Sequence, residues 1–301
     1  MANERAVTIV EVGPRDGLQN EKRPIPTECK LQLIALLADA GFCRIEATAF
    51  VSPKWVPQMA DHDEVMRRAV RRPGLALMAL APNEKGAVAA IGAGAQELAV
   101  FASASETFAA KNTNCTIAES IDRFKPVLSL ARRHRLPVRG YVSCAVDCPY
   151  EGPIAPAAVR AVATRLIEIG CDEIAVADTI GRGVPERVEA MLAALLEAVP
   201  AHQVACHFHD TSGLALANVD VALAHGVRIF DSAAAGLGGC PYAPGAAGNL
   251  ATGRLVEWLN TKGYSHGIDE QLLDRAEQFA AASRHGEAGG FPERSSPSTT
   301  G

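Results

Sequence analysis

The chain alternates short runs of strand-forming residues with amphipathic helical stretches along almost its whole length, and eight such units can be counted. The expected strand and helix of each unit are, in order, 7–12 and 27–40, 43–48 and 61–72, 75–80 and 84–92, 97–103 and 117–135, 138–145 and 156–169, 173–177 and 185–199, 203–207 and 214–224, and 228–233 and 249–260. Eight successive units match the size of a closed barrel, whereas an open doubly wound sheet rarely needs so many. The sequence therefore predicts an α/β protein with a (β/α)8 TIM-barrel fold.

The residues after the eighth unit divide into two parts. Residues 269–283 have a helical pattern, and this helix is expected to cap the barrel or pack beside it. Residues 286–301 are rich in Gly, Pro, Ser and Thr, a composition that predicts a disordered tail. We therefore expect a single catalytic domain over residues 1–285, with a short C-terminal helical extension, and a tail over 286–301.

Composition excludes several classes of partner. The formal net charge of −5 argues against nucleic acid. Neither a signal-peptide pattern nor an uninterrupted apolar run of membrane-spanning length is present, so we expect a cytoplasmic protein that does not enter a membrane. The eight cysteines include no Cys-x-x-Cys pair, and disulfides are not expected. Most of these thiols should be small buried hydrophobes, and only Cys240 lies in a context that suggests more.

Two histidines lie two residues apart in one expected strand. Side chains at this spacing point to the same face of a strand, so His207 and His209 should project side by side. Polar rings on a buried strand need a partner, and one metal ion would serve both of them. A pair of structural histidines is the alternative interpretation.

The loops that follow the expected strands carry most of the reactive side chains. Active sites of such barrels lie at the carboxyl ends of the strands. Asp16, in the loop after the first strand, and Asn249 could add oxygen ligands to the two histidines. This mixed set suits Mg²⁺ or Mn²⁺ better than zinc, which prefers more nitrogen and sulfur. The alternatives are an ion pair between Asp16 and Arg15, and a helix N-cap role for Asn249.

A glycine-rich segment, 236–249, follows the last expected strand. It lacks the Gly-Lys-Ser/Thr ending of a phosphate-binding loop and so is not a nucleotide cradle. Its glycines would permit lid motion that carries Cys240 over the site, the alternative being a tight connection with a buried cysteine. Lys111 and Asn112, expected in the loop after the fourth strand, are candidates for contacting phosphates.

Four motifs carry a resemblance to a known family. They are VEVGPRDGLQN at 10–20, FVSPKWVPQ at 50–58, GYVSC at 140–144 and GLGGCPY at 236–242. Together they closely resemble the 3-hydroxy-3-methylglutaryl-CoA lyase family, over about residues 7 to 260. The first motif is shared in outline with the wider group of metal-dependent barrel lyases and synthases, whereas the cysteine-containing loop is specific to the lyase. The resemblance implies cleavage of an acyl-CoA substrate to acetyl-CoA and acetoacetate with a divalent cation, in leucine degradation or ketone-body formation, by a homodimer.

The resemblance also implies roles for single residues. It places the metal ligands on Asp16, His207, His209 and Asn249, and the catalytic residues on Arg15, Asp16, His207, Cys240, Glu46 and Asp178. We further expect substrate contacts from Arg15, Gln19, Tyr141, Thr179, Lys111 and Asn112. In the implied mechanism Asp16 or His207 is the base, Arg15 stabilises charge on the thioester oxygen, and Cys240 protonates the product enolate. Glu46 and Asp178 are expected to orient Arg15 and the metal ligands.

The chain also departs from the family pattern. The departures are Ala49, Phe208, Ser212 and the pair Gly253-Arg254. They keep two alternatives open, a longer 3-hydroxy-3-alkylglutaryl-CoA and a 4-hydroxy-2-oxo acid as substrate. A catalytically silent barrel that binds acyl-CoA is a third alternative, against which the complete set of motif residues argues.

Overall fold

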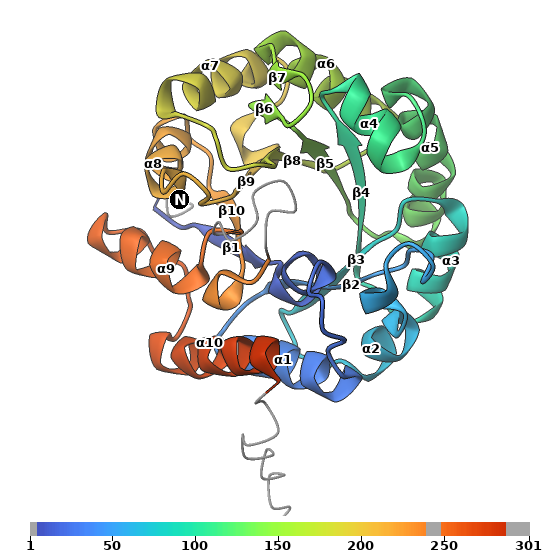
Figure 1. Ribbon diagram of the computed structural model, residues 1–301, viewed down its shortest axis with the longest axis vertical. Coiled ribbons are helices and arrows are strands. Elements are labelled where there is room, and N and C mark those ends of the chain that lie inside the picture. The colour runs from blue at the N-terminus through green and yellow to red at the C-terminus, as the bar shows by residue number, and fades with distance from the viewer. Residues whose placement is uncertain (1–4, 239–247, 287–301) are drawn as a thin grey trace, which may run out of the picture.

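Eight parallel strands close into a barrel, and the helices that connect them surround it (Figure 1). The computed structural model describes residues 5–238 and 248–286. Around the ring the strands follow the order β1, β10, β9, β8, β5, β4, β3, β2. Their bounds are β1 (Thr8–Glu11), β2 (Arg44–Ala49), β3 (Ala76–Leu80), β4 (Glu97–Ser103), β5 (Val138–Ser143), β8 (Glu173–Asp178), β9 (Val204–Phe208) and β10 (Ile229–Ser232). The predicted TIM barrel is confirmed.

The helices lie outside the barrel and bury their apolar faces against the strands. They are α1 (Thr27–Asp39), α2 (His62–Arg68), α3 (Glu84–Gly92), α4 (Glu106–Thr113), α5 (Ile117–His134), α6 (Pro156–Ile169), α7 (Pro185–Leu196), α8 (Ala215–Ala224), α9 (Thr252–Thr261) and α10 (Glu270–His285). The two short strands β6 (Asp147–Cys148) and β7 (Gly152–Pro153) pair in a hairpin after β5. No helix in the described ranges is both long and apolar enough to span a bilayer.

Parallel pairing closes the ring between the first and last strands. β1 pairs with β10 on one side, from Thr8 opposite Ile229, and with β2 on the other, where Val10 lies opposite Arg44. The register of β2 shifts between Glu46 and Thr48. Irregular pairing of this kind is common at the rims of barrels.

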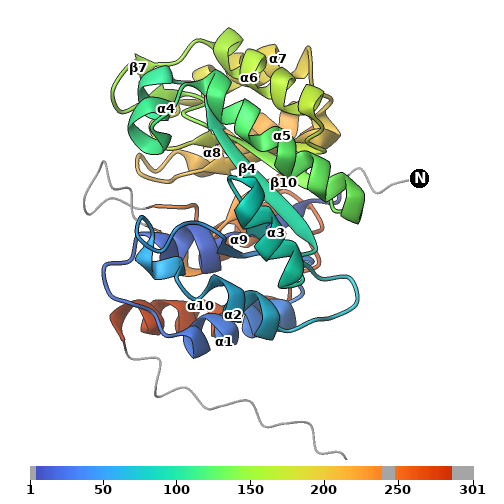
Figure 2. The ribbon, with the colours of Figure 1, turned by 90° about the vertical axis from the view of Figure 1, so that its right-hand side faces the viewer.

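The C-terminal helix α10 packs against α1 on the outside of the barrel, where Figure 2 shows the two helices side by side. Asp269 caps it by accepting the backbone N–H of Leu272. The carboxylate of Glu277 on α10 accepts the backbone N–H groups of Ala235, at 3.1 Å, and Gly253, at 2.8 Å. The helix therefore fastens the chain on both sides of the glycine-rich segment.

One expected loop contains a helix. The segment after β4 was expected to be irregular, but residues Glu106–Thr113 form α4. Ser105 starts this helix, because its hydroxyl accepts the backbone N–H of Phe108 at 3.0 Å. Lys111 and Asn112 therefore lie on a helix, and the prediction that they lie in a loop was wrong. The eight-residue helix is short and mostly polar, and such a segment carries little of the apolar periodicity that marks longer helices.

The last barrel helix begins later than expected, at Thr252, with Ala251 at the N-cap position. Asn249 therefore does not cap it, and that alternative was wrong. Instead, Asn249 forms an isolated antiparallel bridge with His209. This pairing brings the end of the glycine-rich segment against the residue that follows β9.

Candidate active site

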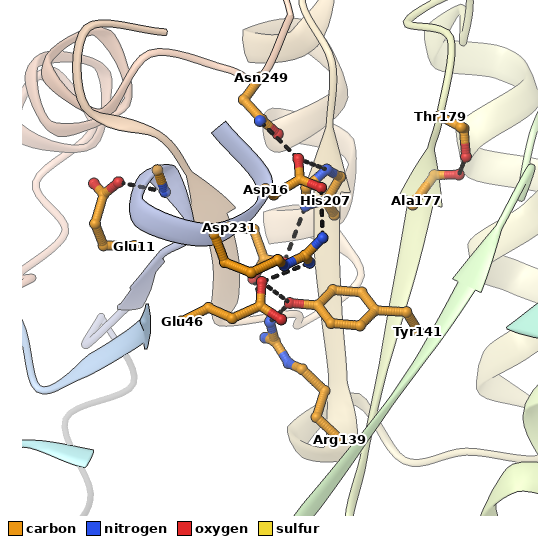
Figure 3. A network of polar contacts seen from close by, with 12 residues as sticks. Glu11, Asp16, Glu46, Arg139, Tyr141, Ala177, Thr179, His207, Asp231 and Asn249 are labelled. Atoms are coloured by element: carbon orange, nitrogen blue, oxygen red, sulfur yellow. Dashed lines mark hydrogen bonds and ion pairs between the residues drawn. The ribbon is translucent and has the colours of Figure 1, made fainter. Parts of the chain in front are cut away.

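Three side chains that could bind a metal meet at the carboxyl end of the barrel. His207 is in β9, His209 follows that strand by one residue, and Asp16 is in a π-helical turn, Gly13–Gly17, after β1. The imidazole centroids are 5.3 Å apart, as expected for side chains on one face of a strand. One ligand atom from each of the three residues lies within 4.8 Å of the others. Figure 3 shows Asp16 next to His207, with Asn249 above Asp16 and joined to it by a dashed line. We call these three residues the metal cluster.

The charge states of Asp16 and His209 fit a divalent cation. At His207 burial lowers the pKa, but the hydrogen bond to Asp231 and the charge of Asp16 outweigh burial and raise it. Burial opposes ionisation of Asp16, but Arg15 and the two histidines outweigh burial and hold the pKa of this carboxyl below its usual range. Burial and the neighbouring His207 lower the pKa of His209 to about 4. Nδ1 of His209 is buried and has no hydrogen-bond partner within the described ranges. A carboxylate and a neutral imidazole with an unused nitrogen are donors that a divalent metal needs.

Asn249 contacts the metal cluster through its side-chain amide. Nδ2 donates to Asp16 Oδ2 at 2.8 Å and to the carbonyl oxygen of Leu237 at 3.1 Å. The amide nitrogen therefore faces Asp16, and rotation of the amide would present its oxygen to a cation. The four predicted metal ligands therefore lie close together. In this structure Asn249 donates a hydrogen bond to Asp16.

Arg15 lies between two carboxylates. Its Nη1 is 2.8 Å from Asp16 Oδ1, and its Nη2 is 2.6 Å from Glu46 Oε2. The guanidinium lies 5.7 Å from the ring centroid of Tyr141. Both Arg15 Nε and Glu46 Oε1 are buried without a hydrogen-bond partner in the described part of the chain. The predicted neighbours of the metal cluster are therefore in contact with one another, and Arg15 keeps an unused donor.

Asp178 has a different position from the one expected. Its carboxylate accepts the backbone N–H groups of Arg182, at 3.3 Å, and Gly183, at 2.8 Å. Burial raises the pKa of Asp178 to about 6. It therefore shapes the loop after β8, and no contact with Arg15 or the metal cluster is found among the described residues, contrary to the expected orienting contact.

The predicted substrate contacts are spread over several elements. Tyr141 is buried beside Arg15, and its hydroxyl lies 3.4 Å from Glu46 Oε2. The hydroxyl of Thr179 accepts the backbone N–H of Cys144 at 2.7 Å. Lys111, next to Asn112 on α4, has its ammonium 4.2 Å from the ring centroid of Tyr150. Gln19, partly buried, follows the turn that carries Asp16. Cys240 lies outside the described residues.

Sequence reasoning missed three buried charged residues of the site. Glu11, Arg139 and Asp231 are all at most 2 % exposed. Asp231 Oδ2 lies 3.1 Å from His207 Nδ1, and Asp231 Oδ1 accepts from Arg139 at 2.7 Å. Glu11 accepts three hydrogen bonds at the end of β1. Their signal in the sequence was a charge inside an otherwise apolar strand, the same signal that singled out His207.

Fold and site together define a class of protein, a TIM-barrel enzyme with a candidate metal centre at the carboxyl ends of its strands. Within that class the sequence model of the HMGL-like family matches residues 6–280, and the chain belongs to this family.

Named relatives agree with this assignment. The mitochondrial hydroxymethylglutaryl-CoA lyase of Gallus gallus is 53% identical over 267 residues, which are 89% of this chain and 90% of the relative. The crystal structure of the HMG-CoA lyase from Brucella melitensis superposes with a TM-score of 0.92 at 53% identity, covering 93% of this chain and 99% of that one. An HMG-CoA lyase from Acinetobacter baumannii, solved in complex with coenzyme A and 3-methylmalate, has a TM-score of 0.89 at 37% identity, covering 95% of this chain and 93% of that one.

Proposed function

We propose that this protein is a divalent-metal-dependent hydroxymethylglutaryl-CoA lyase that cleaves (S)-3-hydroxy-3-methylglutaryl-CoA to acetyl-CoA and acetoacetate. The observation that carries the proposal is the meeting of Asp16, His207 and His209 beside Arg15, in a chain about half identical to lyases of that name. The metal is proposed to be Mg²⁺ or Mn²⁺, because carboxylate, imidazole and amide oxygen suit these ions.

The reaction breaks a carbon–carbon bond next to a tertiary alcohol. When bound, the cation would polarise the substrate hydroxyl and lower its pKa. Asp16 or His207 takes the hydroxyl proton, a carbonyl forms at that carbon, and the electron pair of the breaking bond moves into the thioester as an enolate. The products are then acetoacetate and, after one protonation, acetyl-CoA. A positioned base of this kind contributes about 10²- to 10⁴-fold.

Arg15 is proposed to stabilise the negative charge that develops on the thioester oxygen. Its two ion pairs, with Asp16 and Glu46, fix the guanidinium before substrate arrives, and the unused Nε–H is a donor left for an oxygen of the substrate. A preorganised donor is effective because it needs no reorganisation during the reaction. Glu46 is proposed to position Arg15. Tyr141 lies close enough to contact the same substrate group.

Cys240 is proposed as the acid that protonates the enolate, and the thiolate then regains a proton from the base or from water. What supports this role is the resemblance of the cysteine-containing loop to that of the lyase family. Lys111 and Asn112 are proposed to contact the phosphates of the coenzyme A portion. A positive ammonium suits that portion, because it is strongly anionic.

One coupled assay tests the proposed function. Purified protein is incubated with the methylglutaryl thioester, a longer 3-alkyl analogue or a 4-hydroxy-2-oxo acid, each with Mg²⁺, Mn²⁺ or a chelator. We expect acetoacetate release from the first substrate only with metal. Faster cleavage of either alternative would move the substrate assignment there, and turnover that survives chelation would contradict the metal proposal. Binding of the thioester without any cleavage would favour the third alternative, a catalytically silent barrel that binds acyl-CoA.

The homodimer and a role in leucine degradation stay predictions that rest on the resemblance, and the cytoplasmic location stays a prediction that rests on the sequence pattern. One relative, from Mus musculus, is named cytoplasmic, whereas the Gallus gallus enzyme is named mitochondrial. Light scattering of the purified chain tests the dimer, and fractionation of the source cells tests the location.

A further inference from the structure

A chain of buried ion pairs crosses the interior of the barrel and ends on a metal-cluster histidine. Arg139, with no exposed surface, donates to Glu173 at 2.5 Å and to Asp231 at 2.7 Å. Asp231 in turn lies 3.1 Å from Nδ1 of His207. At its other end, Glu173 accepts from Arg44 at 2.9 Å, and Arg44 also pairs with Glu97. Figure 3 labels Arg139, Asp231 and His207 within one network of polar contacts.

The ion pairs extend through the barrel from the amino ends of its strands to their carboxyl ends. Glu97, Arg44 and Glu173 are the first residues of β4, β2 and β8. Arg139 is the second residue of β5, Asp231 is the third of β10, and His207 is the fourth of β9. Opposite charges therefore alternate from the amino ends of the strands up to the metal cluster at the carboxyl ends.

Stability alone is a poor reason for this arrangement. Removing charges from water is costly, and well-packed apolar side chains of similar volume often stabilise an interior as well or better. TIM barrels ordinarily fill this space with branched apolar side chains. A buried carboxylate that contacts a metal-cluster residue points instead to a role in that site.

The geometry fixes which nitrogen of His207 can face a cation. Nδ1 is directed at Asp231, and Nε2 is directed at the metal cluster, 3.9 Å from Asp16 Oδ2. We infer that Asp231 is a positioning residue for the metal centre. It accepts the Nδ1–H of His207 so that the Nε2 lone pair is presented to the cation, and Arg139 holds Asp231 in that orientation. This inference rests on the proposed metal at the cluster. Histidine ligands commonly donate their second N–H to a carboxylate in this way.

The substitution Asp231→Asn separates the two tasks of the carboxylate. In the wild-type protein each oxygen of Asp231 accepts from one donor, Oδ1 from Arg139 and Oδ2 from His207. Asparagine is nearly the same size but offers one acceptor oxygen for these two donors, so one donor loses its partner. We expect the affinity for Mn²⁺, measured by calorimetry on protein stripped of metal, to fall about 10- to 100-fold.

Asp61→Asn is a matched control. Asp61 also serves one donor with each oxygen, Lys30 at 2.7 Å and Thr27 at 2.8 Å, and it lies between α1 and α2, outside the barrel. Its variant should bind Mn²⁺ within about twofold of wild type. If Asp231→Asn also binds within twofold while the wild type binds normally, the inference fails. If the wild type itself binds no Mn²⁺, the proposed metal site fails instead.

A second measurement needs no variant and so does not depend on whether Asp231→Asn folds. The wild-type protein, labelled with ¹⁵N in histidine and saturated with diamagnetic Mg²⁺, should show the His207 ring protonated on Nδ1 and unprotonated on Nε2. A general loss of packing would not produce this spectroscopic pattern. A ring with its proton on Nε2 would overturn the inference.

Discussion

The carboxylate of Glu11 accepts the backbone N–H of Ala234 at 2.9 Å and thereby joins the end of β1 to the chain that follows β10. The same oxygen accepts from Gly13 at 2.8 Å, and the other oxygen accepts from the hydroxyl of Thr252 at 2.7 Å. Glu11 therefore fastens the turn that carries Arg15 and Asp16 to the start of the glycine-rich segment. Burial, although opposed by these hydrogen bonds, raises the pKa of Glu11 to about 7.

The raised pKa of Glu11 predicts that the contribution of this carboxyl to the stability of the apo-protein falls as the pH rises, opposite in sign to the contribution of His209. Below pH 4.5 the carboxyl is protonated in both states, but between there and about pH 7 the folded state binds the proton more tightly than the unfolded state. The contribution of Glu11 to the free energy of unfolding should therefore fall across this window, by at most about 3 kcal/mol, and then level off.

Glu11→Gln should remove that contribution, because a neutral side chain has no proton to lose, so the free energy of unfolding should change more positively with pH in the variant than in the wild type. Glutamine keeps an acceptor for the two backbone donors and can donate to Thr252, whose hydroxyl also contacts Ser232 at 2.9 Å. Urea unfolding between pH 5 and pH 8, with chelator present, measures the effect. An unchanged slope in the variant would contradict the raised pKa of Glu11.

Arg15→Ala should fold and bind metal but turn over substrate about 10²- to 10³-fold more slowly, because a preorganised charge donor is lost. Removal of Arg15 also leaves Glu46 buried without its cation, which destabilises the protein. The double variant Arg15→Ala with Glu46→Gln is the control, since it removes the stranded charge. Steady-state turnover and Mn²⁺ affinity of both variants are measured. Retention of more than a tenth of wild-type turnover by either would refute the role of Arg15.

Glu46→Gln should lower turnover less, by about tenfold, because Arg15 keeps its contact with Asp16 while one charged partner becomes neutral. The measurement is a cycle of Arg15→Lys, Glu46→Gln and the double variant. A lysine ammonium cannot reproduce the two-sided contact of the guanidinium. Strictly additive effects on turnover would mean that Glu46 does not act through Arg15.

Removal of metal should lower the thermal stability of the protein, since a ligand that binds only the folded state stabilises it by about 2.7 kcal/mol at one hundred times its dissociation constant. We expect the melting temperature to rise when Mn²⁺ is added and to return to the value of the metal-free protein when a chelator is added. His209→Ala should abolish this rise, whereas His266→Ala should keep it, because His266 is a half-buried histidine that contacts Asn260 away from the metal cluster. An equal rise of the melting temperature in both variants would show that the cation binds outside the metal cluster.

Alkylation of Cys240 should abolish turnover while leaving Mn²⁺ affinity unchanged, if its thiol is the acid that protonates the enolate. Cys43 is the exposed thiol among the described cysteines, so the experiment is done in a Cys43→Ser background. Mass spectrometry then verifies that Cys240 carries the label. Full activity of the labelled protein would rule out the proposed acid.

The elements and the core of the metal cluster were predictable because their signals are local. The spacing of His207 and His209 follows from the two-residue period of a strand, and the eight strand–helix units follow from periodicity within each segment. The late start of α9 and the presence of α4 were missed. Caps and short polar helices carry little periodic signal.

By itself, then, the sequence determined the barrel and the chemical kinds of side chain that reach its carboxyl end. Only the tertiary structure decided which charges are partners. Asp231 meets His207 from 24 positions away and Arg139 from 92, and Asp178 turns to its own loop instead of toward Arg15. Such pairings depend on strand order and register around the closed ring, which long-range packing sets. A charged residue in an apolar strand indicates that a partner is needed, but only the fold decides which residue that partner is.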